Sequence, residues 1–389
     1  MHSHRKLQPS SVVNIEDLRR LAKRRLPQVI WDYLEGGAED EVMLRRNCAA
    51  FDRYHLLPRM VTGKGSRDLS ITLFGQRLAA PFMIGPTGLN GIYVPDADLM
   101  LARAAAAAGV GFSLSAGSNN DIEAVARASD GPKFFQLYPW GGREVATRLL
   151  ARARAARLLR AHGHGRFADP GQPRAGCAEP VRPRTAFFSA HRLGRGDPSA
   201  LGRVHLVRPR HAALREPGGV PATGLGRVRA SCLYPCPAQS VLQLGGRWLA
   251  SLAVGGPLGG QGHSHRGRHA PAASHGADAV VVSNHGGRSL DGLPATLDML
   301  PSVAAAAGGM PVLVDSGFRR GSDIVKALAL GAPGVLLGRA PLYGVAAAGE
   351  AGAGRALEIL LQETDRVMGL LGVDSVDALG RQHVGLQPA

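Results

Sequence analysis

The sequence is poor in cysteine, in aromatic residues and in long apolar runs. Four Cys in 389 residues exclude a disulfide-stabilised scaffold. No run of 18 apolar residues occurs, so the sequence predicts no transmembrane helix. Residues 1–11 lack the apolar core of a secretory signal peptide, and we therefore expect a cytoplasmic protein. A C-x-x-C-H haem motif is also missing.

The composition that remains is globular. Apolar residues make up 45% and charged residues 20%, so disorder is not the expected state of the chain as a whole. A length of 389 residues suffices for one large domain or two of ordinary size. The formal net charge of +16 would by itself indicate an anionic partner such as a nucleic acid.

The positive charge, however, is concentrated in the central segment, residues 157–270. These 114 residues hold 17 Arg, no Lys and only four acidic residues. The other 275 residues hold 29 Lys and Arg against 26 Asp and Glu, which is close to balance. Eight of the 14 His and three of the four Cys also lie in the central segment. The net charge is therefore a property of this segment and not of the whole chain.

Three interpretations of the central segment compete. A nucleic-acid-binding arm should carry Lys, helical periodicity and regularly placed aromatics, and these are missing here. A disordered Arg-, Pro- and Gly-rich insert is the second. The third, which we favour, is out-of-frame translation of a GC-rich gene, because wrong-frame GC-rich codons yield Arg, Ala, Gly, Pro and His but very little Lys. Cys232 and Cys236 lack the second ligand pair of a zinc site, so we expect no metal.

On both sides of the central segment, short apolar runs alternate with helical patterns. Before it, runs at 81–85, 109–115 and 133–138 precede predicted helices at 96–108, 120–128 and 143–156. After it, runs at 279–283, 311–315 and 335–338 precede predicted helices at 297–307, 322–330 and 342–348. An amphipathic helix is predicted at 14–25, and a longer closing helix at 354–372.

This alternation predicts parallel strands joined by right-handed crossovers. Six strand–helix units are visible, and the central segment has room for two more. Eight units predict an α/β fold of the TIM (β/α)8 barrel type, whose fourth and fifth strands are disrupted in the chain as written. A doubly wound open sheet is the alternative, but no G-x-G-x-x-G follows the first strand. We expect residues 1–389 to form a single barrel domain interrupted at 157–270.

Several long strings resemble the flavin-dependent α-hydroxy-acid dehydrogenase and oxidase family. They are LPQVIWDYLEGGAEDE (26–41), PFMIGPTGLNG (81–91), FFQLY (134–138), SNHGGRSLDG (283–292) and VLVDSGFRRGSDIVKALALGA (312–332). The string GPTGLNG is similar to the mandelate dehydrogenase branch in particular. The resemblance covers residues 1–156 and 275–389, and implies FMN as the cofactor and oxidation of an (S)-2-hydroxy acid to a 2-oxo acid.

His285 and Arg288 carry the chemistry that such a reaction needs. His285 follows a predicted strand, and a side chain that titrates near neutrality can take a proton from the hydroxyl or the α-carbon of a 2-hydroxy acid. Arg288 offers a fork of donors that matches a carboxylate. In the family, the matching His is the catalytic base and the matching Arg binds the substrate carboxylate. A buried structural His beside a surface Arg is the alternative.

The resemblance also implies a set of cofactor-binding residues. The segment 315–321 follows a strand and opens a helix, and phosphate sites of barrels lie after the last two strands. The FMN phosphate and ribityl chain are expected at Asp315, Ser316, Gly317, Phe318, Arg319, Gly338 and Arg339. Contacts to the flavin are expected from Pro86, Thr87, Gly88, Ser115, Gln136 and Ser283.

Two tyrosines and one glycine concern the substrate. Tyr33 and Tyr138 match substrate-binding tyrosines of the family. Gly117 stands where glycolate oxidase carries a Trp. A glycine at this place leaves space for a large side chain on the substrate, which favours a mandelate-like acid over glycolate.

The chain departs from the family in the central segment. The family carries an Asp and an Arg after the fourth strand, in T-x-D…R-E-R-D-x-x-N-R-F, and a Lys after the fifth, in V-K-G; neither string occurs here. Codons permitted for 161–182, read one nucleotide later, encode L-T-A-T-A-D-L-P-I-P-G-N-R-E-R-D-V-R-N-R-F. Codons for 258–266 encode W-V-V-K-G-I-L-T-A in the same frame. We therefore hypothesise a frameshift near 156 and a restoring one near 270.

The remaining expectations concern partners. The electron acceptor is oxygen, a quinone or a cytochrome, and the resemblance implies a homotetramer. Mandelate dehydrogenases carry a membrane-binding segment inside this gap, so peripheral contact with the inner face of the membrane is a further expectation. Two rival hypotheses remain at this point: an inactive barrel remnant, and a basic nucleic-acid-binding protein.

Overall fold

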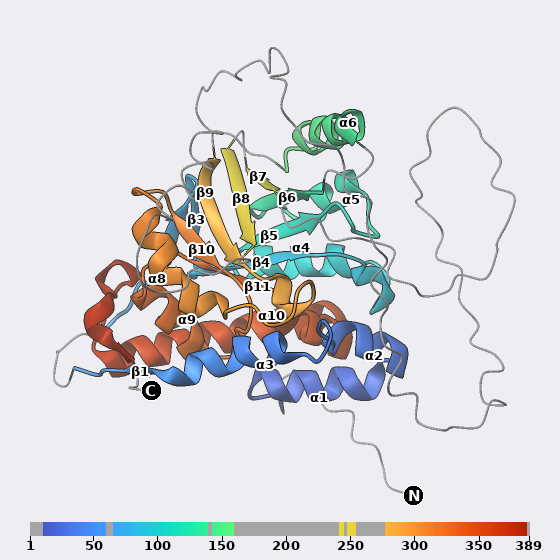
Figure 1. The fold of residues 1–389 in the computed structure, drawn as a ribbon. Coiled ribbons are helices and arrows are strands. Elements are labelled where there is room, and N and C mark those ends of the chain that lie inside the picture. The colour runs from blue at the N-terminus through green and yellow to red at the C-terminus, as the bar shows by residue number, and fades with distance from the viewer. Residues whose placement is uncertain are drawn as a thin grey trace, which may run out of the picture. The chain divides into compact units, whose positions relative to one another are not determined.

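Eight strands close into a barrel in the computed structural model, in the order β10-β11-β4-β5-β6-β7-β8-β9 (Figure 1). Their bounds are β4 Phe82–Thr87, β5 Gly111–Ser115, β6 Lys133–Leu137, β7 Val241–Leu244, β8 Arg247–Ala253, β9 Ala277–Ser283, β10 Val312–Val314 and β11 Val335–Leu337. The prediction of a TIM-type barrel is confirmed, and six of the strands lie within two residues of the runs predicted from the sequence.

The structure describes residues 11–59, 65–138, 142–158, 241–244, 247–253 and 277–386. All of them belong to one compact unit, built from Met1–His162 and Ala238–Ala389. Most of the central segment, 157–270, lies outside the described residues, and so do the places where the alternative reading frame encodes the family strings.

The fourth and fifth barrel positions depart from the TIM pattern. Strands β7 and β8 occupy them and pair with each other antiparallel, with Leu242 opposite Leu249. Strand β7 is also antiparallel to β6, whereas β8 is parallel to β9. A (β/α)8 barrel has eight parallel strands, each followed by a helix. The predicted disruption of the fourth and fifth strands therefore takes the form of one reversed strand.

Helices follow the other strands as predicted. They are α4 Ala97–Ala107, α5 Ile122–Arg127, α6 Gly142–Ala155, α8 Thr296–Ala306, α9 Gly321–Ala329 and α10 Arg339–Leu371. The two helices predicted at 342–348 and 354–372 correspond to the two parts of α10, which are separated by a kink at Ala348 and Gly349, where the backbone leaves helical geometry. Gly349 has a φ of 61°, which a glycine adopts without strain.

The N-terminal segment adds three helices before the barrel, α1 Ile15–Arg25, α2 Gln28–Glu35 and α3 Val42–Ala49. The predicted helix at 14–25 is confirmed: the Asn14 side chain caps α1 by accepting from the backbone N–H of Asp17, and α1 lies along α10 (Figure 1). Helices α2 and α3 were not predicted. Short additional elements are η2 Ala50–Arg53, β1 Tyr54–Leu56, β2 Ile71–Leu73, β3 Gln76–Leu78, η3 Asn90–Ile92, η5 His285–Gly287, η6 Val376–Ala378, η7 Arg381–His383 and β12 Val384–Leu386.

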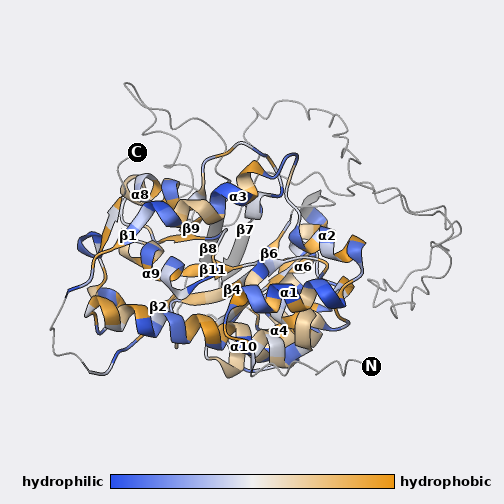
Figure 2. Cartoon of the chain, turned by 90° about the horizontal axis from the view of Figure 1, so that it is seen from below, coloured by the Kyte–Doolittle hydropathy of each residue, from blue (hydrophilic) through white to orange (hydrophobic). Residues whose placement is uncertain are grey.

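The barrel strands supply much of the core. Phe82, Phe112, Phe134 and Leu313 are at most 1% exposed, as expected of parallel strands whose outer faces are covered by helices. Figure 2 shows largely hydrophobic residues on α4 and α10, and many hydrophilic ones on α1. Helices α4 and α10 therefore bury most of their surface, whereas α1 presents a charged face to water.

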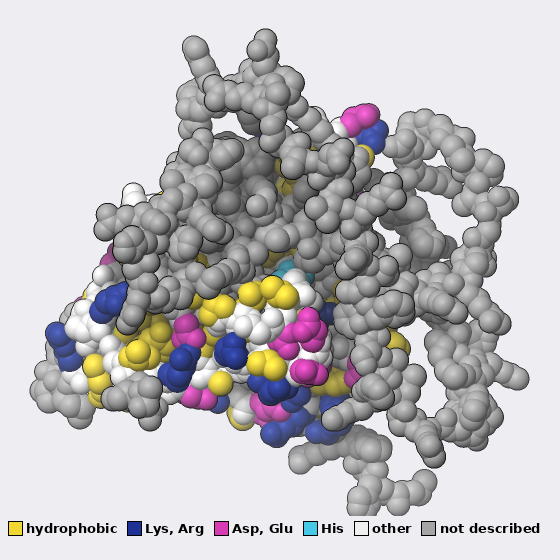
Figure 3. Space-filling view, viewed as in Figure 1, with side chains coloured by type: hydrophobic (Ala, Val, Ile, Leu, Met, Phe, Trp, Pro, Cys, Tyr) yellow, Lys and Arg dark blue, Asp and Glu magenta, His cyan; other side chains and the backbone are white. Residues whose placement is uncertain are grey.

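Charges of both signs lie together on the surface. On the face seen in Figure 3, Lys and Arg side chains are interspersed with Asp and Glu over α1 and α3. Within α1, Arg20 pairs with Glu16 and Asp17. This balance agrees with the near-neutral composition of the chain outside 157–270.

Candidate active site

One rim of the barrel collects most of the predicted site residues. Strands β4, β5, β6, β9, β10 and β11 are parallel, so their carboxyl ends lie at the same opening of the barrel. The predicted residues stand at these ends: Pro86, Thr87 and Gly88 at β4, Ser115 at β5, Gln136 and Tyr138 at β6, Ser283 and His285 at β9, Asp315 at β10, and Gly338 at β11. The barrel thus brings together predicted site residues that lie far apart in the sequence, from Pro86 to Gly338.

His285 begins the turn that follows β9. Its φ is +56°, a conformation that side chains other than glycine rarely adopt, and its backbone N–H donates to Ser283 Oγ at 3.1 Å. The side chain is exposed to solvent although protein surrounds it densely, as expected of a group in a recess. This surrounding, together with the positive charges of Arg288 and Arg339, lowers the pKa of His285 to about 4. His285 is therefore neutral at pH 7, so its imidazole can accept a proton, but it is a weaker base than an ordinary histidine.

The turn after β9 is held in place by the N-terminal segment. The Ala38 N–H donates to the Gly287 carbonyl at 2.8 Å, and Asp291 accepts from the N–H groups of Val42 and Met43 at the start of α3. Gly287 has a φ of +75°, and a side chain on it would lie 2.8 Å from the backbone nitrogen of Leu44. The two strings at 26–41 and 283–292 therefore pack against each other, which the sequence did not indicate.

Arg288 and Tyr33 lie together near His285. The Arg288 guanidinium stands over the Tyr33 ring, 4.8 Å from its centre, and its Nη1 donates to the Gly36 carbonyl at 2.9 Å. Tyr33 is 40% exposed, so part of this residue is accessible to a ligand. The structure thus pairs a predicted carboxylate-binding cation with a predicted substrate-binding tyrosine.

Tyr93 belongs to the same group of side chains, and the sequence reasoning missed it. It follows η3, in the loop after β4, and its ring centre lies 6.4 Å from that of Tyr33. Burial raises the pKa of the Tyr93 phenol, and Arg288 opposes that shift electrostatically. The position of Tyr93 eight residues beyond Gly85, in the loop after the first barrel strand, was the only signal in the sequence.

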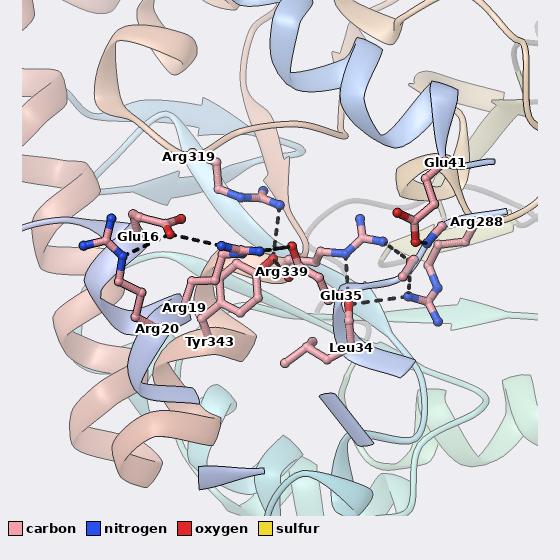
Figure 4. A network of polar contacts seen from close by, with 12 residues as sticks. Glu16, Arg19, Arg20, Leu34, Glu35, Glu41, Arg288, Arg319, Arg339 and Tyr343 are labelled. Carbon is pink, nitrogen blue, oxygen red and sulfur yellow. Dashed lines mark hydrogen bonds and ion pairs between the residues drawn. The ribbon is translucent and has the colours of Figure 1, made fainter. Parts of the chain in front are cut away.

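A second cation, Arg339, begins α10. Its three nitrogens donate to the carbonyls of Leu34 at 3.0 Å, Gly286 at 2.9 Å and Gly36 at 2.8 Å (Figure 4). Burial and the nearby positive charge of Arg288 lower the pKa of Arg339 to about 10, so it stays charged at neutral pH. Two guanidinium groups thus share the carbonyl oxygens at the end of α2, and this arrangement attracts an anion.

Arg319 completes the cationic cluster from the loop after β10. It lies over the Tyr343 ring at 5.4 Å, and its Nη2 donates to the Tyr343 hydroxyl at 3.4 Å. The Tyr343 hydroxyl donates in turn to Glu35, whose carboxylate also accepts from Arg19 Nε at 2.9 Å (Figure 4). Those hydrogen bonds outweigh the effect of burial and lower the pKa of Glu35. Glu35 is a further residue that the sequence reasoning did not single out.

The phosphate of FMN fits the start of α10 better than that of α9. The N–H groups of Arg319 and Arg320 donate to Asp323, and that of Gly321 donates to Glu363, so carboxylates of the chain already occupy this helix end. Gly338 caps α10, and a side chain placed on it would contact nothing within 4 Å. The space above a helix N-terminus, flanked by Arg319 and Arg339, suits a phosphate.

The residues predicted at the flavin ring are also consistent with a bound group. Gln136 is 4% exposed, and its Oε1 has no hydrogen-bond partner among the described residues. A buried, unpaired amide oxygen is costly unless a donor meets it, and a flavin edge supplies such donors. Asp315 ionises less readily than an ordinary aspartate, because burial raises its pKa to about 6. Hydrogen bonds from Ser316 and Ser283 oppose this rise.

The substrate-side predictions fall near the flavin positions. Tyr138 directly follows β6 and is 8% exposed. Gly117 lies in the turn after β5, and its carbonyl accepts from the Leu89 N–H at 2.9 Å. A side chain on Gly88 would lie 3.4 Å from that same carbonyl. Gly117 therefore adjoins the loop that carries Thr87 and Gly88.

A carboxylate partner for His285 is missing from the described part of the chain. The charged groups that shift its pKa are Arg288 and Arg339, both positive. Because β7 is reversed, its carboxyl end points to the opposite opening of the barrel from that of β9, which His285 follows. Within the described residues, no cluster of His, Cys, Asp and Glu could hold a metal ion.

Comparison with known proteins assigns the family. The profile of the FMN-dependent dehydrogenases matches residues 22–160 and 261–386. The chain is 36% identical to the (S)-mandelate dehydrogenase of Pseudomonas putida, over 96% of this chain and 94% of that protein. It is 34% identical to glycolate oxidase 1 of Zea mays, over 96% of this chain and 95% of that protein.

The chain belongs to the FMN-dependent dehydrogenase family. It is thus an oxidoreductase whose cofactor is FMN. Among solved structures, it resembles a soluble mutant of the membrane-associated (S)-mandelate dehydrogenase from P. putida, with a TM-score of 0.72, 32% identity and coverage of 96% of this chain and 99% of that one. A mandelate oxidase bound to benzoyl-formic acid gives a TM-score of 0.69 at 30% identity, with coverage of 97% and 100%. The family resemblance predicted from the sequence is confirmed.

Proposed function

We propose that this FMN-dependent dehydrogenase oxidises an (S)-2-hydroxy acid to the 2-oxo acid and prefers a substrate with a phenyl-sized side chain. The observation that carries the proposal is the meeting of His285, Arg288 and Tyr33 at the rim where the flavin-binding positions gather. The names of its relatives, (S)-mandelate dehydrogenase and glycolate oxidase, agree with a 2-hydroxy-acid substrate.

Three side chains bind the substrate, and a fourth accepts its proton. Arg288 binds the substrate carboxylate through its guanidinium fork, and the Tyr33 and Tyr138 hydroxyls orient the rest of the polar head. The neutral His285 imidazole accepts one proton from the substrate, either from the hydroxyl or from the α-carbon. Bound FMN supplies the acceptor for the two electrons that the substrate loses. The residues alone leave both orders of proton and hydrogen transfer open.

The phosphate end and the ring end of FMN are held by different elements. Arg319 and Arg339 would hold the phosphate at the start of α10, beside Gly338. Thr87, Gly88 and Gln136 would face the ring from β4 and β6. The remaining predicted contacts are Pro86, Ser115 and Ser283, at the carboxyl ends of β4, β5 and β9, and Asp315, Ser316, Gly317 and Phe318, in the loop after β10.

We also propose that residues 157–270 are translated out of frame. The family profile leaves out residues 161–260. This gap begins close to the expected break near 156, and the match resumes nine residues before the expected restoring shift near 270. The reversed β7 supports the same proposal, because a sequence that does not encode the fourth strand cannot be expected to pair in parallel. The chain as written would then lack the carboxylate beside His285 and the lysine after the fifth strand, and we expect it to show little activity.

Partners follow from the same family. One solved (S)-mandelate dehydrogenase is described as a monotopic membrane protein, and on that basis we infer that the frame-restored protein contacts the inner face of the membrane. No helix in the described ranges is both long and apolar enough to cross a membrane. We further infer a homotetramer, and oxygen, a quinone or a cytochrome as the electron acceptor.

The decisive experiment measures reduction of bound flavin by substrate under anaerobic conditions. In a frame-restored protein, His285→Ala should slow reduction by mandelate about 10²- to 10⁴-fold, the usual contribution of a general base, while FMN binding persists. The matched control is His55→Ala, because His55 is exposed on β1 and is not among the predicted site residues. Unchanged reduction in His285→Ala would exclude His285 as the base.

A further inference from the structure

A buried carboxyl group, Asp98, links two loops of the rim. Asp98 lies in the first turn of α4 and is 0% exposed. Its Oδ1 accepts from Asn90 Nδ2 at 2.6 Å, and its Oδ2 accepts from Ser118 Oγ at 2.5 Å. Asn90 belongs to the loop after β4 and Ser118 to the loop after β5. The Asp98 side chain is therefore hydrogen-bonded to both loops.

The first link leads to Thr87. The same Asn90 Nδ2 that donates to Asp98 also donates to Thr87 Oγ1 at 2.9 Å and to the Thr87 carbonyl at 3.1 Å. Asn90 is itself 0% exposed, so no water competes for its amide. Removing the Asp98 carboxylate would free Asn90 to turn, and the hydroxyl of Thr87 would lose its fixed direction.

The second link leads to Gly117. Ser118 Oγ accepts from the Asn120 N–H at 2.9 Å while it donates to Asp98. The Gly117 N–H donates to Ser115 Oγ at 3.1 Å, and the Gly117 carbonyl accepts from Leu89. The turn that holds Gly117 is thus pinned on one side by the loop after β4 and on the other by Asp98.

A role in folding alone does not account for a carboxyl group at this place. Burial raises the pKa of Asp98, which shows that ionisation is costly here. Ser118 and Asn90 are the groups that offset this cost, and no cation of the described residues is among them. An apolar side chain in the first turn of α4 would fill the same space without that cost, so the carboxyl group serves the geometry of its two donors.

We propose that Asp98 is a positioning residue of the active site, which fixes Thr87 for contact with the flavin and the Gly117 turn for contact with the substrate. The inference rests on the proposed function, because that function assigns the roles of Thr87 and Gly117. Asp98 touches neither ligand and acts only through Asn90 and Ser118.

The test is a titration of the full-length apoprotein with FMN, followed by flavin fluorescence. Asp98→Ala should weaken FMN binding about tenfold, because two buried donors lose their acceptor. Asp98→Asn should bind FMN within about threefold of the parent chain: its oxygen still accepts from Asn90, and its amide can donate to Ser118 Oγ. Asp96→Asn is the control for the loss of a nearby carboxylate: the Asp96 side chain accepts from Asn120 Nδ2 at 2.9 Å, in the loop after β5, and an asparagine oxygen can still accept there.

A second variant covers the case in which Asp98→Ala does not fold. Asn90→Ala leaves the contact between Asp98 and Ser118 in place and removes only the link to Thr87, so it should weaken FMN binding to a similar extent. The visible absorption of saturating FMN should change in Asp98→Ala and Asn90→Ala and be restored in Asp98→Asn, which a general loss of stability would not produce.

The outcomes separate the two proposals. Equal FMN affinity and equal flavin spectra in the parent chain, Asp98→Ala and Asn90→Ala would overturn the role of Asp98 and leave the proposed function intact. Weakened binding without rescue in Asp98→Asn would also overturn it, in favour of a structural role. A parent chain that binds no FMN would instead refute the proposed function, and the role of Asp98 with it.

Discussion

Gly317 offers a sharp test of how the loop after β10 is built. Its φ is +89°, and a side chain on it would lie 2.4 Å from the Asn47 carbonyl oxygen and 3.0 Å from the Phe51 ring. Gly309 has the same φ of +89°, but a side chain there would contact nothing within 4 Å. The two glycines therefore separate backbone strain from steric conflict.

The magnitudes follow from these two environments. Alanine at positive φ costs about 1–2 kcal/mol, so Gly309→Ala should lower the free energy of unfolding by roughly that amount. Gly317→Ala adds a conflict with the backbone of α3, and overpacking costs a further ~1–3 kcal/mol. We expect Gly317→Ala to lower the free energy of unfolding by about 2–5 kcal/mol in total.

Urea unfolding followed by circular dichroism measures both variants, and an FMN titration measures the consequence for the site. Gly317→Ala should also weaken FMN binding, because Ser316 and Phe318 move with the loop, whereas Gly309→Ala should not. Equal destabilisation of the two variants would refute the steric argument. Unchanged FMN affinity in a folded Gly317→Ala protein would contradict the placement of this loop at the cofactor.

Three further predictions concern the gene, the substrate and the pH dependence of stability. Sequencing of codons 150–275 should give N-R-E-R-D and V-K-G one nucleotide later, and a gene that lacks them would make the central segment real protein. In a frame-restored protein, Gly117→Trp should lower kcat/KM for mandelate far more than for lactate, at a steric cost of ~1–3 kcal/mol; a ratio that does not move toward lactate would exclude Gly117 as the determinant. Because the pKa of His285 is about 4 in the folded chain against 6.5 as its ordinary value, the unfolded chain binds more protons between these values, and stability should fall as the pH falls through this window. Between about pH 7 and pH 5, the free energy of unfolding of His285→Gln, measured by urea unfolding, should fall less than that of the parent chain. An equal fall in both proteins would show that His285 does not titrate this way.

The sequence predicted the architecture because local patterns carry it. Runs of apolar residues followed by helical periodicity identified six of the eight strands, and their order implied parallel pairing. The sequence predicted two helices on either side of the kink in α10, but it did not predict α2 and α3, whose apolar faces are short. Helix ends and breaks depend on contacts with distant elements, which no local pattern records.

The site divides in the same way. His285, Arg288 and Gly338 could be found from the sequence, because they lie in the segments that follow β9 and β11, in motifs whose chemistry suits a 2-hydroxy acid or a phosphate. Tyr93 was missed, because its position in the loop after the first barrel strand does not by itself single it out; its ring is found beside Tyr33 only in the structure.

By itself, the sequence determined the fold class, the cofactor family and the position of the anomalous segment, since these depend on residue order, motif and composition. Only the tertiary structure decided that β7 runs against its neighbours, that Arg288 and Arg339 share the carbonyls at the end of α2, and that Asp98 joins two loops. These features arise from groups far apart in the chain, or from hydrogen bonds whose partners several positions could supply. Which partner a buried polar group takes is fixed by packing in three dimensions and not by its neighbours in sequence.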